Sequence, residues 1–387
     1  MPSPLTPRQI LERLVAFPTV SRETNLPLVD WVEEFLNDCG ITAHRVWNEE
    51  RTKASLYAHV GPETPGGVVL SGHTDVVPVE GQDWTSDPWT VTERDGRLYG
   101  RGTCDMKGFD ALALAAMALA QEQGVKRPLQ LALSYDEEVG CLGAPAMIEE
   151  MARRLPKAAA VIVGEPSRMR VVTGHKGGGG YLCRVKGVEV HSSILHRGVN
   201  AVMAAARLID WANRKNAESA AATPTPLAAL FDPPWTSVHV GTISGGTAGN
   251  ITAGSCRFDV GFRAVPGETV EDWAAAFEAE ARALEVELKA IRPEAAIELG
   301  RLFAYPPLRP EPQGAAEALA RRLTGDNGEA VVSYGTEAGQ FQAAGYSAVV
   351  CGPGDIAQAH QPDEYLEVSE FEAGWSFMQR LVRDLAA

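Results

Sequence analysis

This chain of 387 residues is short of apolar runs. Its longest run of small apolar residues, 111–120, falls far below the roughly 18 residues that a membrane-spanning helix needs, so we expect no membrane span. The start, MPSPLTPRQILERL, lacks a basic region followed by an apolar stretch, and therefore predicts no secretory signal. Thr6, Pro7 and Gln9 instead predict the cap and first turn of a helix.

Cysteine and positive charge are also scarce. The six cysteines form no CxxC pair, which favours incidental thiols in a reducing cytoplasm over a disulfide framework. Lys and Arg number 35 against 50 Asp and Glu, a formal net charge of −15. This acidic balance argues against binding nucleic acid or an anionic membrane. The 45% hydrophobic content is that of an ordinary globular protein, and the length suggests two or three domains.

Several common functional motifs are missing. GxGxxG, HExxH and GxSxG do not occur, so the sequence carries none of these signatures of dinucleotide binding, zinc proteolysis or serine hydrolysis. KGGGG at 176–180 has the glycine content of a phosphate loop but not the GxxxxGK[ST] order. We interpret it as a flexible hinge.

What is present in the first half is an alternation of apolar and helical segments. It predicts an α/β domain with a mostly parallel sheet flanked by helices. In such sheets, ligands bind at the carboxyl ends of the strands. The expected strands are 54–60, 67–71, 129–134 and 159–164, and the expected helices are 7–17, 26–39, 108–123 and 144–154.

A different pattern follows the glycine run. Its predicted elements have the order β-α-β-β-α-β, which is the split βαβ arrangement of a ferredoxin-like α+β domain. The proline-rich segment at 305–312 predicts a connector. We therefore expect a discontinuous catalytic domain, 1–177 and 305–387, interrupted by an inserted domain, 178–304.

Five motifs place histidines and carboxylates at strand ends or in loops. In SGHTDVVP, His73 and Asp75 point the same way at strand spacing, so Asp75 could orient a metal-binding His73. In GRGTCDMKG, Asp105 precedes a helix and could bridge two cations. Each motif alone is explained as well by a strand-end or capping residue.

The other three motifs lie further along the chain. SYDEEVGCLG offers Glu137 and Glu138, which could serve a metal and a water separately; a solvated acidic loop is the alternative. VIVGEPS ends an apolar strand in Glu165, and GPGDIAQAHQPDEY contributes His360. Together, two histidines and several carboxylates at such positions favour a two-metal centre.

The motifs GHTDVVP, GRGTCDMKG, DEEVG, GEPS and AHQPDEY resemble those of the zinc-dependent aminoacylase and carboxypeptidase superfamily, in the same order over residues 72–365. The resemblance implies that His73, Asp105 and Glu165 hold one Zn²⁺. It implies further that Asp105, as a bridge, binds the second with Glu138 and His360. Co²⁺ or Mn²⁺ could occupy the same ligands.

The resemblance also implies roles for other side chains. Asp75 would orient His73, and Glu137 would be the general base that activates a metal-bridging water. AHQPDEY together with YGTEAGQF at 334–341 is most similar to the deacetylases of this superfamily. Glu337, in the second of these motifs, could face the ammonium group of a substrate side chain, although a glutamate there could equally cap a helix.

In the resembled family the inserted domain forms a homodimer interface and acts as a lid. His191, in VEVHSS, matches a histidine that supports the oxyanion from the partner subunit, although Val190 replaces the usual preceding glycine. The stretch 245–268 resembles the substrate-binding segment, which places Asn250 and Arg263 near the substrate, with Arg263 able to hold a carboxylate.

The expected function is therefore hydrolysis of a small N-acyl amino acid by a cytoplasmic homodimer. The acyl group stays open: an acetylated substrate competes with a succinylated one or a dipeptide. A catalytically silent metal- or ligand-binding relative is a further alternative, which the presence of Glu137 disfavours.

Overall fold

The computed structural model describes residues 5–387, which form two compact units. Unit 1 comprises the chain up to Gly174, Leu308–Val331 and Thr336–Ala387; unit 2 comprises His175–Pro307 and Val332–Gly335. The sequence places 175–177, 305–307 and 332–335 with the catalytic domain, whereas these residues belong to unit 2. Residues 1–4 of the first predicted range lie outside the described residues.

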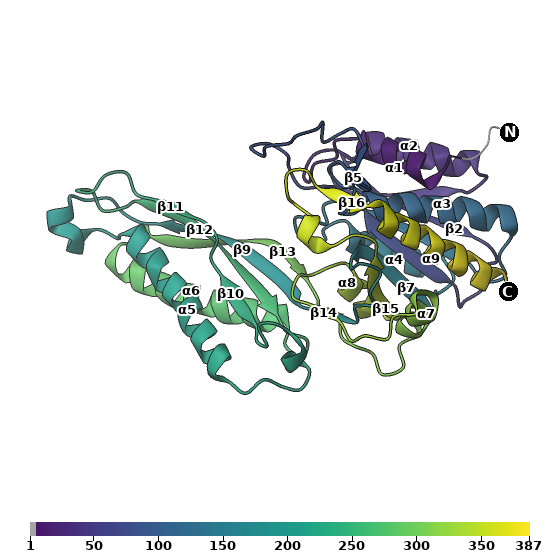
Figure 1. Ribbon diagram of the computed structural model, residues 1–387. Helices are drawn as coiled ribbons and strands as arrows, with labels where there is room; N and C mark the ends of the chain where they lie inside the picture. The colour runs from purple at the N-terminus through teal and green to yellow at the C-terminus, as the bar shows by residue number, and fades with distance from the viewer. Residues whose placement is uncertain (1–4) are drawn as a thin grey trace. The chain divides into compact units, whose positions relative to one another are not determined.

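Unit 1 is built on a sheet with the strand order β1-β2-β6-β3-β7-β15. The last four of these strands run parallel to one another, while β2 is antiparallel to both neighbours. Helices lie on both faces (Figure 1). The predicted α/β class with a mostly parallel sheet is confirmed. The strands are β1 (Ala43–Trp47), β2 (Ala54–Val60), β3 (Val68–His73), β6 (Leu129–Ser134), β7 (Ala160–Pro166) and β15 (Ala348–Gly352).

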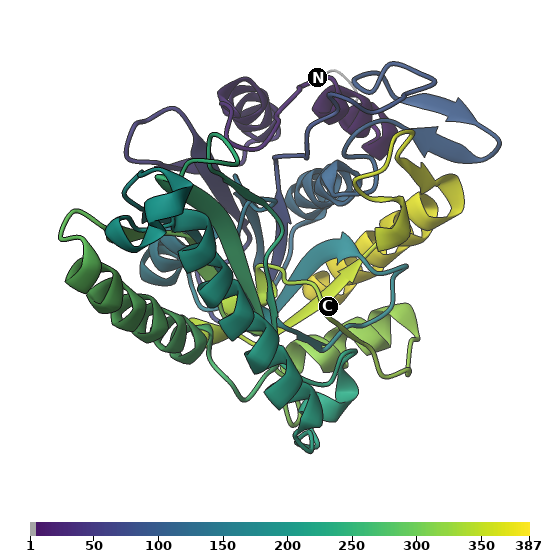
Figure 2. The same cartoon turned by 90° about the vertical axis from the view of Figure 1, so that its left-hand side faces the viewer.

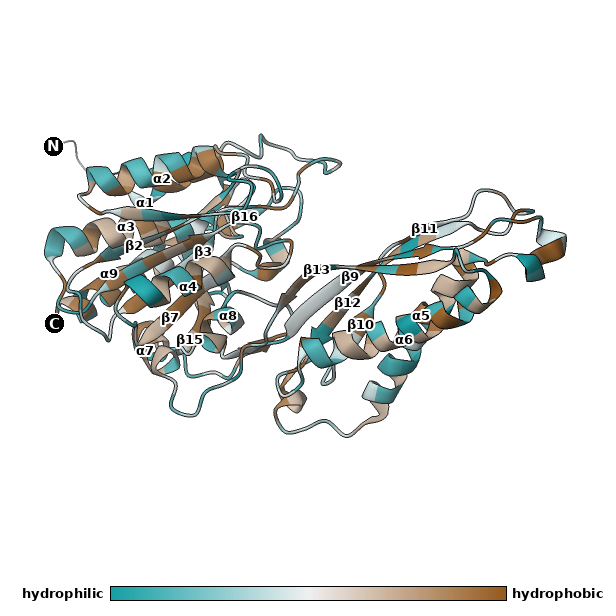
Figure 3. Ribbon diagram, turned by 180° about the vertical axis from the view of Figure 1, so that it is seen from behind, coloured by the Kyte–Doolittle hydropathy of each residue, from teal (hydrophilic) through white to brown (hydrophobic). Residues whose placement is uncertain are grey.

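The central strands β3, β6 and β7 are buried along their whole length, because helices cover both faces of the sheet. Leu129, Leu131 and Leu133 of β6 point into the main core, together with residues of α1, α2, α3, α7 and α9. Helices α4 and α8 pack on the other face. In Figure 3 strands β7 and β15 are largely brown, whereas the outer sides of α2 and α4 are largely teal. The helices are α1 (Pro7–Val15), α2 (Leu26–Asp38), α3 (Lys107–Gln123), α4 (Ala144–Arg154), α7 (Ala315–Thr324), α8 (Ala338–Ala343) and α9 (Val368–Ala386).

The N-terminal cap is as predicted. Thr6 accepts a hydrogen bond from the Gln9 backbone, and the Gln9 side chain accepts one from the Thr6 backbone. This reciprocal box confirms the start of α1 at Pro7.

A small three-stranded sheet, which no local sequence pattern predicts, joins distant motifs. Its strands are β4 (Thr92–Arg94), β5 (Arg97–Tyr99) and β16 (Tyr365–Glu367), in the order β16-β5-β4. Tyr365 pairs with Tyr99. Because GRGTCD follows β5 and AHQPDE precedes β16, this pairing brings the motifs of Asp105 and His360 together.

Unit 2 has an antiparallel sheet in the order β10-β12-β9-β13, with β11 also paired to β12. Helices α5 and α6 pack on the same face of this sheet (Figure 2). The order along the chain is the predicted β-α-β-β-α-β, with the second strand split into β10 and β11. The elements are β9 (Gly177–Lys186), η1 (Ser192–Arg197), α5 (Ala201–Ala221), β10 (Ser237–His239), β11 (Ile243–Gly245), β12 (Ser255–Ala264), α6 (Val270–Ile291) and β13 (Ala296–Tyr305).

The glycine run at 177–180 is not a hinge, contrary to our interpretation of the sequence. It forms the first part of β9 and pairs with β12 and β13 on its two sides. A Cβ at Gly178 would lie 2.3 Å from the Tyr305 ring, and one at Gly179 would lie 2.3 Å from Val270. Glycine is therefore required here because neighbouring side chains cross directly over the strand.

Among the described residues, helices that combine the length and apolar character needed to span a membrane are absent.

Candidate metal centre

Four adjacent strands of unit 1 deliver the predicted ligands other than Asp105, which precedes α3. His73 is the last residue of β3, Glu137 and Glu138 follow β6, and Glu165 lies near the end of β7. His360 follows β15. Because these strands are parallel, their carboxyl ends meet at one edge of the sheet, which is where such folds bind ligands.

His73 is presented with one nitrogen towards the acidic cluster. Its Nδ1 donates to the main-chain carbonyl of Asp75 at 2.9 Å, so a neutral ring leaves the lone pair on Nε2. Nε2 lies 3.1 Å from Asp105 Oδ1 and 3.7 Å from Glu165 Oε1. His73 is fully buried. Its geometry is that of a metal-ligating histidine oriented from behind.

Asp105 lies between the two histidines. Its Oδ1 faces His73, and its Oδ2 lies 3.3 Å from His360 Nε2. The same His360 nitrogen is 2.8 Å from Glu138 Oε2. One carboxylate oxygen thus points to each histidine, which is the arrangement that a bridging ligand between two cations requires.

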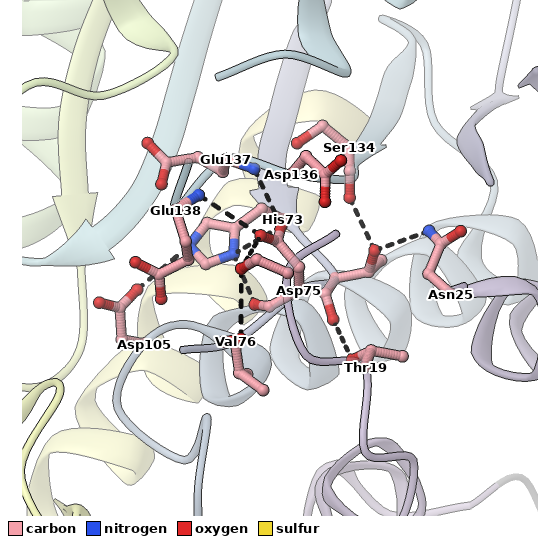
Figure 4. A network of polar contacts seen from close by, with 12 residues as sticks. Thr19, Asn25, His73, Asp75, Val76, Asp105, Ser134, Asp136, Glu137 and Glu138 are labelled. Atoms are coloured by element: carbon pink, nitrogen blue, oxygen red, sulfur yellow. Dashed lines mark hydrogen bonds and ion pairs between the residues drawn. The ribbon is translucent and has the colours of Figure 1, made fainter. Parts of the chain in front are cut away.

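The ligand atoms form two compact sets around His73. In one set the ligand atoms of His73, Glu137 and Glu165 all lie within 4.8 Å of one another, and in the other those of His73, Asp105 and Glu138 do. Figure 4 shows Glu137 and Glu138 projecting from one loop beside His73 and Asp105. Glu137, the predicted base, therefore lies as close to His73 and Glu165 as a metal ligand would.

Burial and mutual repulsion disfavour the charged forms of these carboxylates. Burial, with the nearby carboxylates, raises the pKa of Glu137 to about 8. Burial and the charge of Asp105 raise the pKa of Glu138 to about 7 and that of Glu165 well above its ordinary value. This is the response of acids that share a site with too little positive charge.

The two histidines respond in the opposite sense. Burial lowers the pKa of His73, but the hydrogen bond to Asp105 and the charge of Glu165 outweigh burial and raise it well above its ordinary value. Hydrogen bonds to Asp105 and Glu138 raise the pKa of His360 to about 10. Burial opposes ionisation of Asp105, yet both histidines hold its pKa below its usual range.

The residues present fit a pair of divalent cations. The donor set is imidazole and carboxylate, which suits Zn²⁺ and related metals. Glu138 Oε1 is buried without a hydrogen-bond partner in the part of the chain described. An orphaned carboxylate oxygen beside raised carboxyl pKa values is the electrostatic signature of a cation site.

Asp75 acts through its backbone and its carboxylate on different neighbours. Its carboxylate Oδ1 is 3.6 Å from His73 Nδ1, too far for a hydrogen bond, which the main-chain carbonyl accepts instead. The carboxylate accepts from the backbone nitrogens of Glu137 at 3.0 Å and Glu138 at 3.4 Å, and from Ser21 Oγ at 2.7 Å (Figure 4 shows the first two). Asp75 therefore holds both His73 and the Glu137 loop.

Two supporting charges were not identified from the sequence. Arg101 and Glu364 form an ion pair at 2.7 Å with both side chains about 1% exposed. The other Glu364 oxygen accepts from the backbone nitrogens of Cys104 at 2.9 Å and Asp105 at 3.0 Å. Arg101 lies in the motif GRGTCD, and Glu364 lies in AHQPDEY. Charged residues are rarely buried unless they are paired, so a charge inside each of these motifs could have indicated an ion pair.

Glu337 lies deeper in unit 1 than predicted. It is about 1% exposed, and its two oxygens accept hydrogen bonds from Ser71 Oγ and Ser134 Oγ. This burial argues against the expectation that Glu337 faces the ammonium group of a substrate.

His191, in unit 2, caps the short helix η1. Its Nδ1 accepts from the backbone nitrogen of Ser193 at 3.2 Å. A neutral ring that accepts at Nδ1 carries its proton on Nε2. His191 is exposed, so this N–H is available to an external acceptor.

Asn250 and Arg263 also belong to unit 2. Asn250 lies in an exposed loop, where its main-chain oxygen accepts from the Ser192 nitrogen at 3.0 Å. Arg263 is an exposed residue at the end of β12, opposite Ser237 and Gly178. The structure therefore brings His73, Asp75, Asp105, Glu137, Glu138, Glu165 and His360 together in unit 1 and places His191, Asn250 and Arg263 in unit 2.

Residues 69–384 match peptidase family M20/M25/M40, and the chain belongs to this family. The family is named for peptidases, which are enzymes that hydrolyse amide bonds. Among curated relatives, the acetylornithine deacetylase of Myxococcus xanthus is 38% identical over 370 residues, which cover 94% of this chain and 93% of that protein.

Solved structures share the fold. A metallo-carboxypeptidase of the M20 family from Sulfolobus solfataricus has a TM-score of 0.80 at 17% identity, covering 98% of this chain and 99% of its own. The Bacillus subtilis YXEP protein, described as a dinuclear metal binding peptidase from the M20 family, has a TM-score of 0.64 at 15% identity, covering 98% and 97%. Family membership and the ligand cluster together make this chain a metal-dependent amide hydrolase.

The raised pKa values predict how pH affects the metal-free protein. A carboxyl group with a raised folded-state pKa stabilises the fold at low pH and loses that contribution as the pH rises, for Glu137 from about 4.5 to about 8. His360 acts in the same direction, because its contribution is complete below about 6.5 and is lost towards about 10. We expect saturating Zn²⁺ to raise Tm more at pH 8 than at pH 6, measured by thermal unfolding of chelator-treated protein. An equal or smaller shift at pH 8 would contradict the assignment of these groups to a cation site.

Proposed function

We propose that this enzyme hydrolyses N²-acetyl-L-ornithine to L-ornithine and acetate, a step of arginine biosynthesis. The observation that carries the proposal is the 38% identity to an acetylornithine deacetylase over nearly the whole of both chains. The arrangement of two histidines and several carboxylates around Asp105 supports it, since amide hydrolysis needs an activated water and a polarised carbonyl.

We propose two Zn²⁺ as the cofactors, with Co²⁺ or Mn²⁺ as substitutes. His73, Asp105 and Glu165 would hold one, and Asp105, Glu138 and His360 the other. When bound, such a metal pair polarises the amide oxygen and lowers the pKa of a water molecule towards neutrality. The three carboxylate ligands, Asp105, Glu138 and Glu165, would offset three of the four positive charges of such a pair.

Glu137 is the proposed general base. Its carboxylate takes a proton from the attacking water while the new C–O bond forms at the acyl carbon, and it passes that proton to the nitrogen as the C–N bond breaks. Cys141 Sγ donates to Glu137 Oε1 at 3.2 Å, and Asp75 holds the Glu137 backbone nitrogen. Both contacts restrict the carboxylate to one orientation.

The proposed substrate contacts come from unit 2. Arg263 would pair with the α-carboxylate through two parallel hydrogen bonds, and Asn250 would add a neutral one. His191, from the partner subunit of a homodimer, would donate its Nε2 proton to the oxyanion, a contribution that is typically a few kcal/mol. The cap that leaves this N–H free supports that role.

We propose that unit 2 forms the homodimer interface. Several large apolar side chains are exposed on segments that meet at one end of this unit. There His191 and Ile251 form an isolated β-bridge, and Gly246 lies close to Val202. Exposed apolar residues grouped in this way are typical of interaction surfaces. They are Ile194, Leu195, Met203, Ile243 and Ile251.

We infer a cytoplasmic location. All six cysteines carry free thiols, and five are buried. This usage is typical of proteins from a reducing compartment.

Substrate specificity tests the main proposal. We expect kcat/KM for N-acetylornithine to exceed that for N-succinyl-diaminopimelate and N-acetylmethionine by at least about tenfold, because the contacts of a cognate substrate are worth a few kcal/mol. The assay compares all three with the zinc-loaded enzyme. Best turnover of the succinylated compound would make the protein a desuccinylase, and turnover of none would favour a ligand-binding relative.

Replacing Glu137 by Gln tests the base. We expect kcat to fall by at least about 100-fold, since a positioned general base contributes roughly 10²–10⁴-fold. Metal analysis should still find two zinc ions per chain. Glu149→Gln, on the exposed side of α4, is the matched control and should keep normal turnover. A Glu137→Gln enzyme that is fully metallated and fast would remove this residue from catalysis.

Light scattering tests the dimer. We expect a mass twice the 41.4 kDa of one chain, and a monomer for Ile243→Lys because a lysine cannot be buried there without a partner. The control is Val286→Lys, which alters an exposed valine on α6 and should stay dimeric. A wild-type mass of one chain at micromolar concentration would exclude the dimer.

A further inference from the structure

Glu337 connects two strands that carry the metal centre. It precedes α8, and its carboxylate accepts from Ser71 Oγ of β3 at 3.2 Å and from Ser134 Oγ of β6. Ser71 comes two residues before His73, and Ser134 comes three before Glu137. One buried side chain therefore ties the carboxyl ends of both neighbouring strands.

The register of these strands makes the link specific. In the parallel pairing of β3 with β6, His73 lies opposite Ser134. Any change in the distance between Glu337 and Ser134 would therefore shift the residue that pairs with His73. The same change would move the start of the loop that presents Glu137 and Glu138.

A carboxylate at this place is costly for the fold. Glu337 is fully buried, and in the chain from residue 5 onward no lysine or arginine lies within ion-pair distance of it. Burial raises its pKa to about 7. A buried acid with only hydroxyl donors is destabilising unless positive charge is placed nearby. The His73 imidazole supplies positive charge that acts on Glu337 against the effect of burial, and the proposed cations would add to it.

Helix α8 also contacts the loop that carries Glu137 and Cys141. Gln340 Nε2 donates to the main-chain oxygen of Cys141 at 3.0 Å, and Cys141 Sγ donates to Glu137 Oε1. The start of α8 thus supports β3, β6 and the loop that holds the proposed base. All of these residues belong to unit 1.

We propose that Glu337 is a positioning residue of the metal centre, which fixes the ends of β3 and β6 relative to each other and thereby sets the spacing of His73 from Glu137 and Glu138. This inference rests on the proposed amide hydrolysis at that centre. It replaces the expectation that Glu337 binds the ornithine side chain, because a carboxylate occupied by two serines inside the unit has no surface to offer a substrate.

The test compares Glu337→Gln and Glu337→Ala with wild type on a cationic and a neutral substrate, N-acetylornithine and N-acetylmethionine. Loss of a residue that supports metal ligands typically costs about 10- to 100-fold in activity or metal affinity. We expect Glu337→Ala to lower kcat by such a factor equally for both substrates, with KM changed less than about twofold. Glu337→Gln keeps one acceptor oxygen and should recover part of the loss.

Zinc affinity gives a readout that does not depend on activity. Competition with a chromophoric chelator should show that Glu337→Ala binds Zn²⁺ at least about tenfold more weakly than wild type. Glu329→Gln, which removes a carboxylate from an exposed loop residue before α8, is the matched control and should match wild type. Circular dichroism establishes that each variant is folded.

The outcomes separate the alternatives. A KM increase confined to N-acetylornithine would show a substrate contact and overturn the proposal, as would unchanged kcat together with unchanged zinc affinity. If the Glu337 variants do not fold, Ser134→Ala, which removes one of the two hydrogen bonds, should give the same loss in smaller measure. If wild type does not hydrolyse N-acetylornithine, the proposed function fails, while the zinc comparison still decides the role of Glu337.

Discussion

Repulsion among carboxylates buried at one edge of a parallel sheet is the constraint on which this structure depends. Glu137, Glu138 and Glu165 would each be better solvated apart, and their raised pKa values express that cost. The fold keeps them together by attaching their backbones to fixed acceptors. Divalent cations would relieve this repulsion when they bind. The electrostatic cost of the metal-free site therefore contributes to its affinity for metal.

The supporting contacts follow a common plan. Carboxylates beside the ligand cluster accept hydrogen bonds from backbone nitrogens and so fix the segments that carry the ligands. Asp75 takes the nitrogens of the Glu137 loop, and Glu364 takes those of Cys104 and Asp105. Asp136, the residue before Glu137, pairs with the buried ammonium of Lys53 at 2.6 Å and anchors the same loop. Acidic residues thus serve both as proposed metal ligands and as the groups that position those ligands.

Much of this could be predicted from the sequence, because apolar strands buried on both faces are unmistakable and their carboxyl ends converge in a parallel sheet. The bounds of β2, β6 and α4 agree with the predicted segments. The glycine run was misjudged because its reason lies in side chains more than 90 residues away, such as Tyr305. Glu337 was misjudged for the same cause: only the tertiary structure shows that two serines enclose it. Short strands such as β5 and β16 form through pairing between distant segments, which local patterns do not report.

The distance along the chain between the ligands has a consequence for biosynthesis. His360 meets Glu138 across 222 residues, and β15 joins the sheet beside β7 only when the last part of the chain is present. During synthesis from the N-terminus, β3, β6 and β7 can pair long before His360 leaves the ribosome. A truncated or stalled chain therefore exposes an incomplete set of acids that cannot enclose both cations. The complete ligand set therefore forms only after the segment that contains His360 has been synthesised.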